Sequence, residues 1–182
     1  MSHHGHGEPS FATAADADRL EREAEGLLED TDAALARIAA HVGRVSRVID
    51  LGCGPGVVTC VLAERFPESS VVAADSSPVM LSRVAARAER LGLRDRVTTV
   101  AADLAGGLDA LGDADLVWAS MVLHHVDDVA TAVEHLRRLL TPRGVLAVVE
   151  RTGTELPGIG VLDDVPLPSG RRLWLGGAVE ST

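Results

Sequence analysis

Hydrophobic and polar positions along the chain follow two alternating patterns after residue 44. Short runs of Val, Ile, Ala and Leu alternate with longer stretches in which apolar residues recur at helical spacing. The first pattern is typical of buried strands and the second of amphipathic helices. Strands that alternate with helices form βαβ units, which place parallel strands in one sheet. We therefore predict a doubly wound α/β fold with a mainly parallel sheet and helices on both faces, with strands at RVID, SSVVAA, RVTTVAA, ADLVWAS and GVLAVVE.

Local signals mark the starts of two of the predicted helices. Ser77 and Pro78 form an N-cap and first-turn pair before VMLSRVAARAERLG, a helix that closes on Gly92. Asp127 or Asp128 caps the later helix VATAVEHLRRLL. These signals indicate where two of the helices between the predicted strands begin.

The segment before the sheet divides into a tail and a helical cover. Residues 16–44 carry leucines at helical spacing among charged residues, with a break indicated at Gly26 and the following EDTD stretch, and we expect them to cover the start of the domain. Residues 1–15 form a His- and Gly-rich tail that we expect to be disordered. Three of its histidines could hold a divalent metal, but no metal site is predicted; they are His3, His4 and His6.

Residues 151–182 form a Gly- and Pro-rich tail in which the pattern fades. The run RRLWLGG predicts one further strand, and we see no signal for another. We therefore expect the C-terminal strands of the sheet to be incomplete.

Composition limits the partners and the compartment. The chain has 182 residues, a formal net charge of -10 and only 2% aromatic residues. A negative field and few stacking side chains disfavour nucleic acids and anionic membranes as partners. Two cysteines support neither a disulfide framework nor a metal cluster, and no apolar run is long enough to span a bilayer, so we expect a cytoplasmic protein.

Three glycines follow the first predicted strand at every second position, in VIDLGCGPGVV. Gly52, Gly54 and Gly56 allow backbone angles that a Cβ forbids and let a ligand approach the main chain. In a parallel α/β sheet, ligands bind at this edge. The dinucleotide fingerprint would require a third glycine at position 57, where this chain has Val, and Pro55 removes an amide that a pyrophosphate would use.

Acidic residues end the first three predicted strands. Asp75 can accept hydrogen bonds from both ribose hydroxyls, and Asp103 can accept from the exocyclic amine of an adenine that packs on Leu104. Asp50 suits an ammonium group better than a pyrophosphate. The set fits an adenosine with a cationic amino-acid tail and no phosphate, which is S-adenosylmethionine.

The order of motifs resembles that of class I S-adenosylmethionine-dependent methyltransferases of the bacterial small-molecule type, with a Rossmann-like core over residues 45–150. The pieces that carry the resemblance are VIDLGCGPG, VVAADSSPVML, VTTVAADL, DADLVWASMVLHHV and LRRLLTPRGVLAVVE. The resemblance implies a methyltransferase that acts on a small-molecule acceptor. It also implies cofactor-binding positions at Asp50, Gly52, Cys53, Gly54, Asp75, Ser76, Met80, Asp103, Leu104, Ala119 and Ser120.

Catalytic residues are harder to assign, because methyl transfer from a sulfonium needs a base only when the acceptor must lose a proton. The candidate bases are His124 and His125, with His125 preferred; packing or capping of the following helix is the alternative. The family fold continues after the fifth strand with a helix and two antiparallel strands, for which this sequence shows too little signal. Three explanations fit this weak signal: the chain is truncated, the sheet edge is covered by a tail or a homodimer, or the chain is a module that binds cofactor without catalysis. An NAD-dependent oxidoreductase is the third hypothesis, based on the glycine turn and Asp75.

Overall fold

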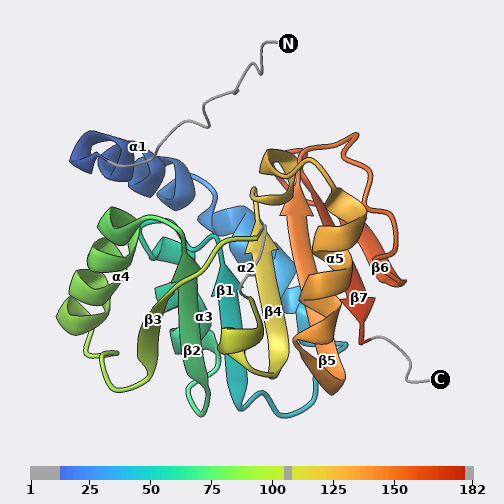
Figure 1. Ribbon diagram of the computed structural model, residues 1–182, viewed down its shortest axis with the longest axis horizontal. Coiled ribbons are helices and arrows are strands. Elements are labelled where there is room, and N and C mark those ends of the chain that lie inside the picture. The colour runs from blue at the N-terminus through green and yellow to red at the C-terminus, as the bar shows by residue number, and fades with distance from the viewer. Residues whose placement is uncertain (1–12, 105–107, 179–182) are drawn as a thin grey trace, which may run out of the picture.

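The computed structural model describes residues 13–104 and 108–178, which form one α/β unit (Figure 1). Its seven-stranded sheet has the order β3-β2-β1-β4-β5-β7-β6. The strands are β1 (Arg47–Leu51), β2 (Ser70–Asp75), β3 (Val97–Ala101), β4 (Ala114–Ser120), β5 (Leu140–Glu150), β6 (Val161–Pro166) and β7 (Arg172–Gly177). Strands β1 to β5 are parallel, and β7 runs antiparallel to both β5 and β6. The predicted fold class is confirmed.

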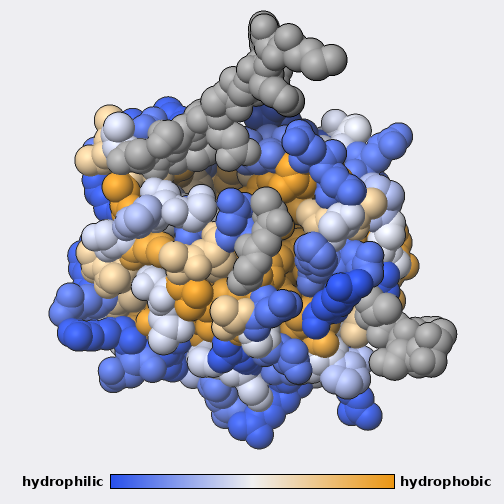
Figure 2. Space-filling model, in the orientation of Figure 1, coloured by the Kyte–Doolittle hydropathy of each residue, from blue (hydrophilic) through white to orange (hydrophobic). Residues whose placement is uncertain are grey.

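Helices cover both faces of the sheet, as the pattern predicted. They are α1 (Ala14–Glu25), α2 (Leu28–Ile38), α3 (Val57–Arg65), α4 (Pro78–Arg90) and α5 (Val129–Arg138), with short 3-10 turns η1 (Leu108–Leu111) and η2 (Leu123–His125). Apolar residues of α2, α3 and α4 share one core cluster, and those of α5, η1 and η2 share the other. Figure 2 shows apolar residues at the surface in the middle of the α5 face, where the described chain between β3 and β4 has only η1. This face therefore has less helical cover.

The predicted helix caps are present. The Ser77 hydroxyl accepts a hydrogen bond from the amide of Met80 at the start of α4, and Pro78 is the first residue of that helix. Asp128, rather than its neighbour, caps α5 by accepting from the amide of Thr131 at 3.0 Å. These caps end the loops that follow β2 and β4, so they help to shape the carboxyl-terminal edge of the sheet.

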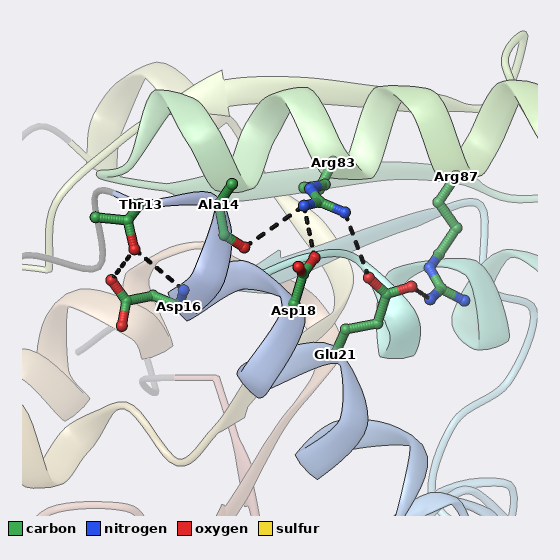
Figure 3. A network of polar contacts seen from close by, with 7 residues as sticks. All are labelled: Thr13, Ala14, Asp16, Asp18, Glu21, Arg83 and Arg87. Atoms are coloured by element: carbon green, nitrogen blue, oxygen red, sulfur yellow. Dashed lines mark hydrogen bonds and ion pairs between the residues drawn. The ribbon is translucent and has the colours of Figure 1, made fainter.

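The N-terminal cover consists of α1 and α2, which are separated at Gly26 and Leu27, whereas the EDTD stretch lies inside α2. Most of the tail predicted to be disordered, residues 1–12, lies outside the described residues. Ion pairs fasten α1 to α4: Arg83 contacts Asp18 at 2.6 Å, and Arg87 contacts Glu21 (Figure 3). Helix α1 is thereby held beyond the carboxyl-terminal ends of β1 to β3.

The C-terminal segment supplies two strands where the sequence predicted one. The run RRLWLGG forms β7, which covers the edge of β5, with Leu173 and Leu175 fully buried. Strand β6 gave no signal because it lies at the sheet edge, with four of its six residues exposed and with Asp163, Asp164 and a terminal proline in its sequence. Within the described residues between β5 and β6 there is no helix, in agreement with the expected shortfall. The expectation that a pair of strands could not form is corrected.

Among the residues that the structure describes, none of the helices is long and apolar enough to cross a bilayer.

Candidate functional site

The turn from β1 into α3 depends on glycine for two different reasons. Gly52, Gly54 and Gly56 all have positive φ, at 66°, 52° and 84°. A Cβ at Gly52 would lie 2.0 Å from Val122 Cγ1, so a side chain there would displace the loop after β4. At Gly54 a Cβ would meet nothing within 4 Å, which leaves the main chain open to a ligand.

The amides of this turn are already bonded within the protein. Those of Gly52 and Cys53 donate to the carbonyl oxygen of Ala74, at 2.8 and 3.1 Å. The amide of Gly54 donates to Asp75 Oδ2 at 3.0 Å, and the other oxygen of this carboxylate accepts from the amide of Ser77 at 2.8 Å. Asp75 therefore joins the end of β2 to the glycine turn. The predicted binding of a ligand by the Gly54 amide requires this carboxylate to change partner.

Asp50 is a buried acid without an ion-pair partner among the described residues. Its side chain is 2% exposed, and Asp50 Oδ2 accepts a hydrogen bond of 2.6 Å from the Thr59 hydroxyl. Burial raises the pKa of Asp50 from 3.8 to about 7; the Thr59 hydrogen bond lowers it, and the negative charge of Asp75 raises it. A carboxyl group with such a pKa is poised to ionise when a cation arrives.

A cavity of about 1020 Å³ lies at the carboxyl-terminal edge of the sheet, under α1 and the start of α2. Its lining includes most of the predicted site: Asp50, Gly52, Cys53, Gly54, Asp75, Ser76, Met80, Asp103, Leu104, Ser120, His124 and His125. Asp103 is exposed, Leu104 is half-buried and Met80 is almost fully buried. The structure thus brings together residues from four strand ends.

Ala119 is the exception among the predicted positions. It is fully buried in the core on the α5 side of the sheet and does not line the cavity. Side chains alternate between the two faces along a strand, so Ala119 points away from the face that Trp118 and Ser120 share. The predicted role of Ala119 in cofactor binding is not supported by this geometry, whereas Ser120 does line the cavity.

The first of the two histidines after β4, His124, has a partner that the sequence did not reveal. Glu150, at the end of β5, is fully buried; it accepts from the amide of Leu123 at 2.8 Å and lies 2.9 Å from His124 Nδ1. The rings of His124 and His125 contact each other, with centroids 4.0 Å apart. The sequence signal for this role of Glu150 is its position as an acid at the end of an otherwise apolar strand. Glu150 fixes the ring of His124 and leaves its Nε2 as the nitrogen for other partners.

Metal chemistry finds no support in the described part of the chain, where no group of three or more His, Cys, Asp or Glu side chains could hold an ion. The three histidines near the N-terminus lie outside that part.

Comparisons with known proteins agree with this geometry. A family model described as a methyltransferase domain matches residues 49–146. The chain is 41% identical over 123 residues to a trans-aconitate 2-methyltransferase of Methylobacterium radiotolerans, covering 63% of this chain and 40% of that protein. A protein of the same name from an Azoarcus species is 38% identical, with 69% of this chain and 47% of the relative covered. The chain therefore spans less than half the length of these curated relatives.

Among solved structures, a SAM-dependent methyltransferase from Aquifex aeolicus superposes with a TM-score of 0.73 at 19% identity, covering 91% of this chain and 98% of that one. At this identity the likeness shows the fold alone. The family model, however, covers more than half of the chain, including the glycine turn and the ends of β1 to β4. The chain belongs to the class I S-adenosylmethionine-dependent methyltransferase family.

Proposed function

We propose that the chain binds S-adenosylmethionine in the cavity at the strand ends and transfers its methyl group to a small-molecule acceptor. The observation that carries this proposal is the set of three carboxylates, Asp50, Asp75 and Asp103, that line one cavity around a turn with open main chain at Gly54. The names of the curated relatives support the same reaction.

Each acid suits a different part of the cofactor. Asp50 lies deepest, beside the glycine turn, and a buried carboxylate without an ion-pair partner among the described residues suits the ammonium group of the methionine end. Asp75 is placed at the end of β2 to accept from the ribose hydroxyls, in exchange for the amides that it now binds. Asp103, Leu104, Ser76 and Met80 would then surround the adenine.

The transfer itself is an in-line displacement on an activated methyl group. The protein's tasks are to align the acceptor and to exclude water, and such positioning lowers a barrier by roughly 7–11 kcal/mol. A base is required only for an acceptor that must lose a proton. His124 is then better placed than His125, because the bond from its Nδ1 to Glu150 fixes its ring.

Calorimetric titration with S-adenosylhomocysteine tests the binding half of this proposal. We expect binding by the wild-type protein, a large loss of affinity in Asp75→Ala because the ribose loses a charged acceptor, and no loss in Asp95→Ala, a matched exposed acid outside the cavity. Folded protein that binds NAD but not S-adenosylhomocysteine would point to an oxidoreductase and refute the proposal.

Transfer of labelled methyl from S-adenosylmethionine to a panel of small acceptors tests the catalytic half. Methylation of any member supports the enzyme. Tight binding of S-adenosylhomocysteine without methylation across the panel would instead indicate a module that binds the cofactor without catalysis.

A further inference from the structure

Charges around the cavity are divided between its two ends. The ends of β1, β2 and β3 contribute Asp50, Asp75 and Asp103, which the proposed function assigns to the cofactor. Beyond β4, the lining carries two histidines and two arginines, Arg151 and Arg171. The arginines make this part beyond β4 a cationic end of the cavity, while α1 separately adds Arg19, Arg22 and Glu23 to the lining.

The acids near this cationic end are already engaged. Glu150 is held by the Leu123 amide and by His124. Asp30, which is buried at the start of α2, accepts from both the amide and the hydroxyl of Ser169. Arg171 Nη1 lies 4.0 Å from Asp30 Oδ2, which is a long ion pair, and no ion pair joins either carboxylate to Arg151 among the described residues.

Arg151 follows β5 directly and is exposed to the cavity. Within the described residues its guanidinium group has no hydrogen-bond or ion-pair partner. Arg171 precedes β7, beside the same end of β5, because Glu150 pairs with Arg172 across the two strands. One Arg171 nitrogen, Nη1, donates to the Ser169 hydroxyl at 3.1 Å, while its Nε is buried and has no acceptor in the described chain. Both side chains retain unused donors.

We propose that Arg151 and Arg171 bind a carboxylate of the methyl acceptor, so that the substrate is a small organic acid. This inference rests on the proposed function. Guanidinium groups present forked donors that match a carboxylate, and they stay charged at all relevant pH values. The chain has a net charge of -10, so its overall field repels an anion, and a local pair of arginines supplies the attraction that this substrate needs.

The bound carboxylate is not the group that receives the methyl. Hydrogen bonds from guanidinium groups stabilise the negative charge of a carboxylate and make its oxygens weaker nucleophiles than those of a free carboxylate. The acceptor therefore carries a second nucleophilic group, directed toward Ser120 and the cofactor sulfonium, and the arginine pair acts as a handle that sets its orientation.

Binding of small acids to the complex with S-adenosylhomocysteine tests the handle without requiring turnover. The probes are malonate, succinate, trans-aconitate and salicylate, each compared with its neutral methyl ester or amide by calorimetry at saturating S-adenosylhomocysteine. We expect at least one acid to bind about tenfold or more tightly than its neutral counterpart. Binding of none of the acids, or equal binding of acid and neutral forms, would overturn the inference.

Variants identify the residues. Arg151→Gln and Arg171→Gln should each weaken acid binding about tenfold or more while leaving the affinity for S-adenosylhomocysteine within about twofold. The matched control is Arg143→Gln, an exposed arginine of β5 outside the cavity, which should change neither affinity. Unchanged acid binding in both cavity variants would overturn the assignment.

The two proposals fail in distinguishable ways. Loss of S-adenosylhomocysteine binding in the wild-type protein would contradict the proposed function itself. Normal cofactor binding with methylation of neutral acceptors as readily as acids would leave the proposed function intact and refute the arginine handle. When an acid substrate is turned over, Arg151→Gln should raise its KM about tenfold or more and lower kcat/KM by at least the same factor.

Discussion

Titration of Asp50 should make the folded protein less stable as the pH rises from about 4 to about 7. The pKa of this buried acid is raised from 3.8 to about 7. In this window the unfolded chain has lost the Asp50 proton, whereas the folded protein retains it, so folding takes up a proton and stability falls with rising pH. Three pH units at about 1.4 kcal/mol each give a loss of about 4 kcal/mol, fully present above pH 7 and absent below pH 4.

Urea unfolding of wild-type protein and Asp50→Asn across pH 4.5 to 8 measures this loss. Asn keeps the size of Asp and can still accept the Thr59 hydrogen bond, but it does not ionise. The difference in unfolding free energy between the two proteins isolates Asp50, because the other carboxylates are common to both. The unfolding free energy of Asp50→Asn, relative to that of the wild type, should rise with pH and reach a plateau above pH 7. A difference that stays constant across the range would refute the reasoning.

Removal of the Thr59 hydroxyl sharpens the test. The hydrogen bond from Thr59 lowers the pKa of Asp50, so Thr59→Val should raise this pKa further and make the plateau begin at a higher pH than in the wild type. A plateau at lower pH would show that Thr59 does not stabilise the ionised carboxylate.

The same acid should couple cofactor binding to protons. An ammonium group beside Asp50 favours the ionised carboxylate, so at pH 6 binding of S-adenosylhomocysteine should release a proton and tighten as the pH rises toward 7. Calorimetry in two buffers with different ionisation enthalpies counts this proton. Asp50→Asn should abolish the release, and wild-type binding without proton release would place the ammonium group elsewhere.

Three further changes probe the scaffold. Gly52→Ala should lower Tm and abolish binding of S-adenosylhomocysteine, since φ is 66° and the new Cβ would lie 2.0 Å from Val122. The neutral control in the same melting assay is Gly43→Ala, because a Cβ there meets nothing within 4 Å. Arg87→Gln should speed amide hydrogen exchange in α1 without changing exchange in the central strands, because it removes the ion pairs with Glu21 and Glu25; unchanged exchange would mean that packing alone holds α1. Asp115→Ala should lower the free energy of unfolding in urea by about 2 kcal/mol, because two backbone amides at the start of β1 lose a charged acceptor, and a loss below about 0.5 kcal/mol would contradict this.

Local patterns were sufficient to predict the central sheet. Strands β1, β2, β4 and β5 are largely buried, so each appears in the sequence as a nearly continuous apolar run, whereas β3 lies at the sheet edge and is mostly exposed. Capping residues such as Ser77 act within one helical turn and were equally readable. Strand β6 could not be predicted this way, because its stability comes from pairing with β7 rather than from its own apolar residues.

The same distinction separates the two halves of the site. Asp50, Asp75 and Asp103 could be predicted because parallel strands bring their carboxyl ends to one edge, so a position at a strand end implies a position in space. The sequence positions of Glu150 and Arg171 do not imply their positions in the site in this way. Their roles depend on contacts with segments far along the chain, His124 in one case and the α2 residue Asp30 in the other.

These long-range contacts lie at the end of the cavity that we propose for the acceptor. The cofactor end uses a turn and strand ends that the fold itself positions, and the acceptor end uses side chains from loops and from the antiparallel strands. Loops on a fixed scaffold vary with little effect on stability. Substrate identity is therefore expected to depend on residues such as Arg151, whose role cannot be predicted from the local sequence. The preference for an acid or a neutral acceptor then depends on the charges in the folded cavity.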